Sequence, residues 1–204
     1  MPDISYLKVI KEDGSEALGG SQTWIEDPKQ NGSYCGIVAG LDRVLEMKGI
    51  KSIDMKEYMQ KLQDAAEYIR PVMLPFNIKP VETKYGTFYG SFGVSAGRLK
   101  RGIRRLGEKY GINIRLKKIK LKDADKLLSQ GEKLIFLIRA PLKNVTLRND
   151  NRCPSEVNAH WVTAYASDEE NYMVQSWGRE YKIAKADFKK RLVFVTVYQT
   201  LHTF

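Results

Sequence analysis

Apolar residues recur at intervals of three and four positions in three stretches of the first half of the chain. This spacing predicts three amphipathic helices. The first begins at Cys35 and ends at Gly49, the second spans about 54–69, and the third begins after Ser95, a good N-cap residue, and reaches Tyr110. Their buried faces carry Ile37, Leu41, Val44 and Leu45, then Met55, Tyr58, Met59, Leu62, Ala65 and Ile69, and then Leu99, Ile103 and Leu106.

The second half of the chain is dominated by apolar runs of strand length. We expect strands at 112–119, 134–138, 160–165, 172–177, 180–183 and 192–198, a further short strand at 6–10, and short helices near 124–128 and 186–189. Residues 72–94 are broken by Pro and Gly, and residues 141–158 are polar, so both segments are expected to be irregular. Helices followed by strands indicate an α+β fold.

The chain length favours a single domain. The 204 residues, 43% of them hydrophobic, can bury a sizeable core. We expect one domain over 1–204, with a helical lobe at about 30–111 and a sheet lobe at about 112–204. No apolar run reaches the roughly 18 residues of a membrane span. Without a signal-peptide pattern or a disulfide framework, we expect a cytoplasmic protein, or one exported by a signal-independent route.

Positive charge is concentrated in one segment. The formal net charge is +10, and the segment 98–122 contains eleven Lys and Arg residues but only one acid, Glu108. A basic helix face is usually just solvated, but this one favours an acidic protein or an anionic membrane surface as partner. Nucleic acid is disfavoured, because the segment lacks the interleaved aromatic residues of a stacking platform.

Candidate chemistry starts from the scarce residues. Of the two histidines, His202 lies near the end of the chain, so His-dependent chemistry points to His160. Cys35 follows a Gly/Asn/Ser turn and opens a helix, where free N–H groups and the helix dipole are expected to lower the pKa of a thiol. Cys153, in a polar loop before Pro154, is interpreted as an inert thiol, with a redox role left open.

Gln30 precedes Cys35 by five residues. A side-chain amide beside the backbone N–H of a nucleophile makes an oxyanion hole with two donors. Two Cys and two His at these spacings do not match a zinc site, and no phosphate-binding glycine motif is present. We therefore expect no metal and no cofactor.

These motifs follow the order of a known superfamily. The segment from Gln30 to Cys35-Gly36 resembles the nucleophile motif of papain-like cysteine peptidases, including those of family C39, and is also similar to that of phytochelatin synthase. His160-Trp161-Val162, followed by Gln175-Ser176-Trp177-Gly178, is similar to the later half of that pattern, where an Asn precedes Ser-Trp-Gly. The resemblance implies a two-lobe fold, with Cys35 on a helical lobe and His160 on an antiparallel, barrel-like sheet.

Two departures from the family pattern concern individual roles. The spacing from Gln30 to Cys35 is five residues, whereas papain relatives use six. Gln175 stands where the family has Asn, so the resemblance gives Gln175 the role of orienting His160, with Ser176, Asp168 and Asn171 as alternatives.

The resemblance implies a function as well. It predicts hydrolysis of peptide or isopeptide bonds, with Cys35 as nucleophile and His160 as base. One alternative is an acyl or peptidyl transferase on the same fold. Another is a catalytically inactive module that binds acidic protein, membrane or nucleic acid through the basic segment 98–122.

Overall fold

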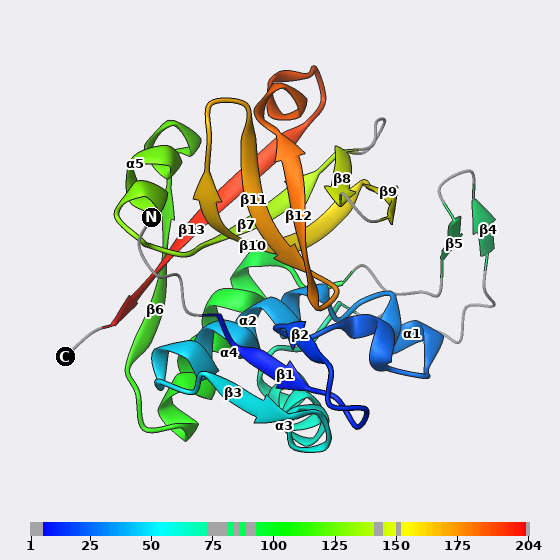
Figure 1. The fold of residues 1–204 in the computed structure, drawn as a ribbon, viewed down its shortest axis with the longest axis vertical. Helices are drawn as coiled ribbons and strands as arrows, with labels where there is room; N and C mark the ends of the chain where they lie inside the picture. Colours follow the sequence, from blue (N-terminus) through cyan, green and yellow to red (C-terminus); the bar gives the residue numbers. More distant parts are fainter. Residues whose placement is uncertain are drawn as a thin grey trace.

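A computed structural model describes residues 6–72, 81–83, 86–88, 93–140, 145–149 and 152–202. It is a mixed α+β structure in which the three long helices cover one face of a large antiparallel sheet (Figure 1). The α+β class predicted from the sequence is therefore confirmed. The helices are α1 (Pro28–Asn31), α2 (Cys35–Met47), α3 (Met55–Tyr68), α4 (Ala96–Lys109) and α5 (Ala124–Ser129), with 3-10 turns η1 (Gln22–Trp24), η2 (Leu121–Asp123) and η3 (Lys185–Lys189).

The three predicted long helices are present, and side-chain caps mark where α3 and α4 begin. The Asp54 carboxylate accepts from the backbone N–H of Lys56 and Glu57 at the start of α3, and the Ser95 hydroxyl accepts from Arg98 N at the start of α4. Gly49 follows α2 with a positive φ of 83°, which L-residues rarely adopt.

The large sheet has eight strands in the order β6-β13-β7-β10-β11-β12-β8-β9, and all neighbours are antiparallel. The strands are β6 (Ile114–Ile119), β7 (Leu134–Arg139), β8 (Val145–Asn149), β9 (Arg152–Val157), β10 (Ala159–Ser167), β11 (Asn171–Ser176), β12 (Arg179–Ala184) and β13 (Phe194–His202). The expectation that 141–158 is irregular was wrong: the segment contains the hairpin β8–β9, in which Val145 and Leu147 alternate with polar residues while β9 is polar except for its end.

A smaller sheet of three strands lies at the N-terminal end, in the order β2-β1-β3. Its strands are β1 (Lys8–Ile10), β2 (Glu16–Leu18) and β3 (Ser52–Asp54), and β1 pairs in parallel with β3. Only β1 was predicted: β2 and β3 have three residues each, and the parallel pairing of β3 joins segments far apart in the chain. The described parts of the segment 72–94 include a short hairpin of β4 (Val81–Thr83) and β5 (Gly86–Phe88), and the rest of the irregular segment predicted there lies largely outside the described residues.

Two hydrophobic clusters form on the two faces of the large sheet. One joins α2, α3 and α4 to side chains such as Leu137 and Trp161. The other joins α5 and η3 to side chains such as Phe136 and Val162. Because α2 packs directly on β10, the helix that begins at Cys35 lies against the strand that carries His160. No helix among the described residues is long and apolar enough to cross a bilayer.

Candidate active site

Cys35 is the first residue of α2, and its neighbour Gly36 allows the close packing of this helix end. A Cβ on Gly36 would lie 2.8 Å from Val94 Cβ and 2.9 Å from Trp161 Cδ1. Trp161 is also held in place, since its Nε1 donates to Val94 O at 2.8 Å. The residue after His160 therefore fixes the start of the Cys35 helix against β10.

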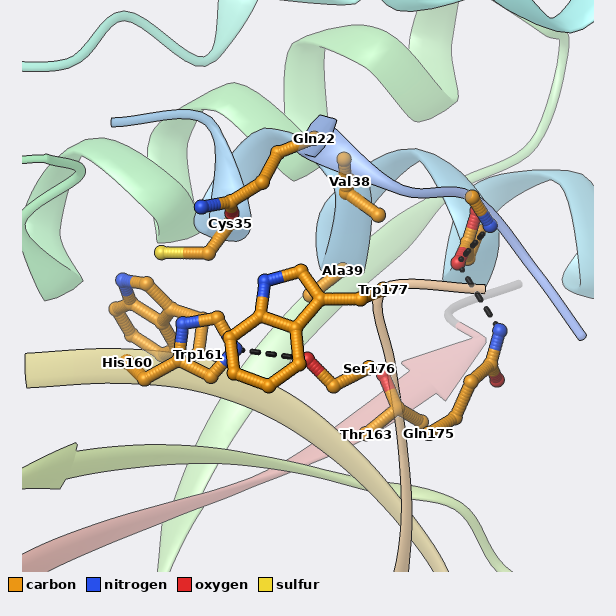
Figure 2. A pocket seen from close by; sticks show the side chains of 12 residues that line it. Gln22, Cys35, Val38, Ala39, His160, Trp161, Thr163, Gln175, Ser176 and Trp177 are labelled. Carbon is orange, nitrogen blue, oxygen red and sulfur yellow. Dashed lines mark hydrogen bonds between the residues drawn. The ribbon is translucent and has the colours of Figure 1, made fainter. Parts of the chain in front are cut away.

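His160 and Cys35 line one pocket, and Figure 2 shows the Cys35 sulfur directed toward the imidazole of His160. The Nε2 atom of His160 lies 2.7 Å from Ser176 Oγ. Trp177 stacks on the other side of the imidazole, with 4.6 Å between ring centroids and 26° between ring planes. The imidazole is thus held by one hydrogen bond and one aromatic face.

The turn between β11 and β12 aims Trp177 at His160. Ser176 pairs with Arg179, so Trp177 and Gly178 form a two-residue hairpin turn, and both have positive φ, 49° and 72°. Two-residue turns with positive φ at both positions match the twist of a hairpin. A positive φ costs a tryptophan about 1 kcal/mol or more in backbone strain, and strained residues of this kind often occur at functional sites.

Burial shifts both candidate catalytic groups toward their neutral forms. Burial raises the pKa of the Cys35 thiol, against opposing hydrogen bonds from backbone groups of Trp161, Gly36 and Cys35 itself. Burial lowers the pKa of His160 to about 4. The direction for Cys35 is opposite to the expectation that the helix start lowers the thiol pKa, because desolvation outweighs the backbone hydrogen bonds at the helix start.

Gln30 does not reach the site. It lies on the exposed α1, and it is not among the residues that line the pocket. Gln22, in η1, lines the pocket instead, and Figure 2 shows its side-chain amide extending toward Cys35. Gln22, thirteen residues before Cys35, thus lies beside Cys35 where Gln30 was expected. A local sequence pattern does not mark Gln22, because the loop that carries it is placed by tertiary pairing.

Gln175 also differs from its expected position. Its Nε2 donates to Leu18 O at 2.8 Å and to Asp42 Oδ2 at 3.2 Å, while Ser176 contacts His160. Gln175 therefore holds the segment before Gln22 rather than the imidazole. The alternatives Asp168 and Asn171 lie at the far end of the β10–β11 hairpin, where the Asp168 carboxylate accepts from Asn171 N at 2.6 Å.

Asp42 is the centre of a buried polar cluster beneath the pocket. Tyr58 Oη donates to Asp42 Oδ1 at 2.7 Å, and Gly20 N donates to Oδ2 at 3.1 Å. Burial raises the pKa of Asp42 to about 7, although the hydrogen bonds from Tyr58 and Gly20 lower it in part. The cluster joins α2, β11 and the segment that leads to Gln22, so it ties the Cys35 helix to the large sheet at this point.

Two glycines allow that segment to approach the cluster. A Cβ on Gly19 would lie 1.5 Å from Gln175 Nε2, and a Cβ on Gly20 would lie 1.8 Å from Tyr58 Oη. Gly178 pairs with the same segment, since Leu18 N donates to Gly178 O and Gly178 N donates to Gly20 O, each at 2.9 Å. The turn that places Trp177 therefore also places the loop of Gln22.

The pocket between Cys35 and His160 is small, with a volume of about 20 Å³. This is room for about one water molecule, so a substrate chain would lie across its mouth. Within the described part of the chain, no group of three or more His, Cys, Asp or Glu residues could hold a metal ion. The side chain of Cys153 lies outside the described residues.

The chain was compared with known proteins. No protein-family model matches the chain, and no curated protein matches it in sequence. Among solved structures, the chain is similar to a crystal structure from Bacillus anthracis named as a putative C39-like peptidase, with a TM-score of 0.46 and 17% identity over 81% of this chain and 87% of that one.

Proposed function

We propose that this protein is a cysteine peptidase that hydrolyses peptide or isopeptide bonds, with Cys35 as nucleophile and His160 as general base. The observation that carries the proposal is the single pocket that Cys35 and His160 share, with Ser176 Oγ on the Nε2 of the imidazole. A nucleophile, a base and a third group that orients the base are the parts of an acyl-transfer site.

The reaction starts from the neutral pair. With Nε2 on Ser176, the other ring nitrogen, Nδ1, takes the thiol proton while sulfur attacks the carbonyl carbon of the substrate. The negative oxygen that forms is stabilised by the side-chain amide of Gln22 and by the backbone N–H of Cys35. The imidazolium then protonates the leaving amine, the C–N bond breaks, and a thioester remains on Cys35.

Water completes the cycle. Neutral His160 takes a proton from a water molecule, the oxygen attacks the thioester, and the thiolate leaves and recovers the proton from His160. Trp177 covers one face of the imidazole throughout. This contact keeps bulk water from that face and holds the ring in one orientation.

The test is covalent trapping together with turnover. A peptidyl acyloxymethyl ketone should add one probe mass to the intact protein, at Cys35, and a quenched fluorescent peptide library should be cleaved. Cys35→Ala should lose both signals, and His160→Ala should lose most of the trapping rate. Products that carry an added amine in place of water would favour a transferase. A chain that is neither labelled nor active, although folded, would refute the proposal.

A further inference from the structure

A second concave surface lies outside the candidate active site, between α4 and the edge strand β6. The groove has a volume of about 490 Å³. Its lining consists of six cations and two leucines, namely Lys100, Arg101, Arg104, Arg115, Leu116, Lys117, Lys118 and Leu201. The basic segment found in the sequence therefore lines a groove with cations from both α4 and β6.

The cations of this groove are largely without counter-ions. Arg104 lies 3.8 Å from Glu108, with both side chains more than half exposed. Among the described residues, the other five cations form no salt bridge. An exposed pair at that distance contributes little, so the groove keeps nearly its full positive charge for a ligand.

One wall of the groove is a sheet edge. In the described part of the chain, β6 pairs with β13 alone and is the last strand of the sheet. The exposed Arg115 and Lys117 are two residues apart on β6, so their side chains leave the same face about 6.7 Å apart. An added strand has the same repeat, so alternate side chains of such a strand can meet these two cations.

The lining distinguishes between polyanions. It contains no aromatic side chain on which a base could stack, so a single-stranded nucleic acid would be held by its phosphates alone. The groove is concave, and the large exposed apolar side chains found among the described residues, Leu192 and Phe194, are not part of it. A flat lipid surface therefore fits less well than a chain that enters the groove.

We propose that this groove binds an extended acidic peptide segment, which adds to the free edge of β6 and places alternate carboxylates on Arg115 and Lys117. Binding of an acidic peptide by the groove does not depend on the proposed peptidase activity. Only the further role of the groove, holding an acidic part of a protein substrate, rests on that activity. Arg101 and Arg104 on α4 add positive charge along the same groove.

The binding test uses the full chain with Cys35→Ala, so that its result does not depend on catalysis. A fluorescein-labelled octapeptide of alternating Glu and Val is titrated by anisotropy at low salt. The variant Arg115→Glu/Lys117→Glu should bind at least about tenfold more weakly, since each replaced ion pair becomes a repulsion. The matched control is Lys51→Glu/Lys56→Glu, which changes the net charge equally at exposed sites outside the groove and should retain most of the affinity.

Two further probes decide the mode of binding. N-methylation of the valines removes the peptide N–H groups that a strand would donate, and should weaken binding by about tenfold or more. Equal binding of the methylated peptide would overturn strand addition. Tighter binding of a thymidine oligonucleotide, or of phosphatidylserine vesicles, with loss in the same variant would overturn the acidic peptide as occupant. Equal affinity of both charge variants would overturn the site itself.

The substrate role has its own measurement. With active chain, a cleavable peptide that carries an acidic tail should have a lower KM than the same peptide without the tail. This advantage should disappear in Arg115→Glu/Lys117→Glu and persist in Lys51→Glu/Lys56→Glu. If neither peptide is cleaved while the octapeptide still binds, the peptidase proposal fails and the groove remains.

Discussion

Ser176 Oγ lies 2.7 Å from Nε2 of His160, so a hydroxyl occupies the place where an Asn side chain would be expected from the papain pattern. A serine hydroxyl is neutral and can either donate or accept, and it therefore orients the imidazole without favouring a charged ring. This agrees with the burial that lowers the pKa of His160 to about 4. The pKa shifts of His160 and Cys35 both favour the neutral forms over a thiolate–imidazolium pair.

Removal of that hydroxyl tests its orienting role. Ser176→Ala should lower kcat/KM by about fivefold, because a typical hydrogen bond contributes roughly 1 kcal/mol. The loss should appear in kcat rather than in KM. Ser167→Ala, at the other end of β10, is the control for a lost hydroxyl. Equal activity of the two variants would show that Ser176 does not hold the base.

Substitutions of Gln22 and Gln30 test which side chain donates to the oxyanion. Gln22→Ala should lower kcat about a hundredfold or more, the usual cost of one lost donor. Gln30→Ala should leave activity nearly unchanged, because Gln30 is exposed on α1 and outside the pocket. Single-turnover rates on the same fluorescent peptide measure both. The reverse order of effects would return the role to Gln30 and contradict the position of η1.

The protonation state of His160 can be observed directly. The chain has only two histidines, so their ring signals in a carbon–proton correlation spectrum can be assigned with His202→Gln. The His160 signal should titrate near pH 4, because burial disfavours the imidazolium. Trp177→Ala opens one face of the ring to water and should move the midpoint upward, toward 6.5. A wild-type midpoint above 6.5 would instead indicate a thiolate–imidazolium pair.

Short sequence motifs predict part of the candidate site. Cys35 and His160 each belong to such a motif at the start of a helix or strand, and both line the pocket. Gln175 and Ser176 are neighbours on one strand, where successive side chains point to opposite faces. A difference of one residue in register thus decides which of them reaches His160, and the sequence pattern does not contain that information.

The residues that the sequence did not reveal depend on distant contacts. Gln22 reaches the pocket because Gly19 and Gly20 pack closely on Gln175 and Tyr58, and because Gly178 pairs with the same segment. Asp42 lies on α2 among apolar residues and has no neighbouring motif. Its role follows from three partners that are between 16 and 133 residues away in the chain. Such placement comes from tertiary packing rather than from periodicity.

Asp42 gives a prediction for stability as a function of pH. Burial raises its pKa from 3.8 to about 7, so the folded chain keeps this proton between those values while the unfolded chain has lost it. The contribution of Asp42 to the free energy of unfolding must therefore fall as pH rises from about 4 to 7. His160 acts in the opposite direction, because its pKa is lowered from 6.5 to about 4, and it adds stability as pH rises through that window.

A variant separates these two contributions. Asp42→Asn keeps the shape and an oxygen that can accept from Tyr58, and it removes the ionisation while leaving His160 unchanged. The difference in free energy of unfolding, wild type minus variant, should decrease steadily from pH 4 to pH 7, as measured by urea denaturation at fixed salt. The same variant should retain trapping at Cys35 if the cluster serves to hold the Gln22 loop. A difference that stays constant with pH would show that Asp42 ionises normally, and the cluster would then be an ordinary set of hydrogen bonds.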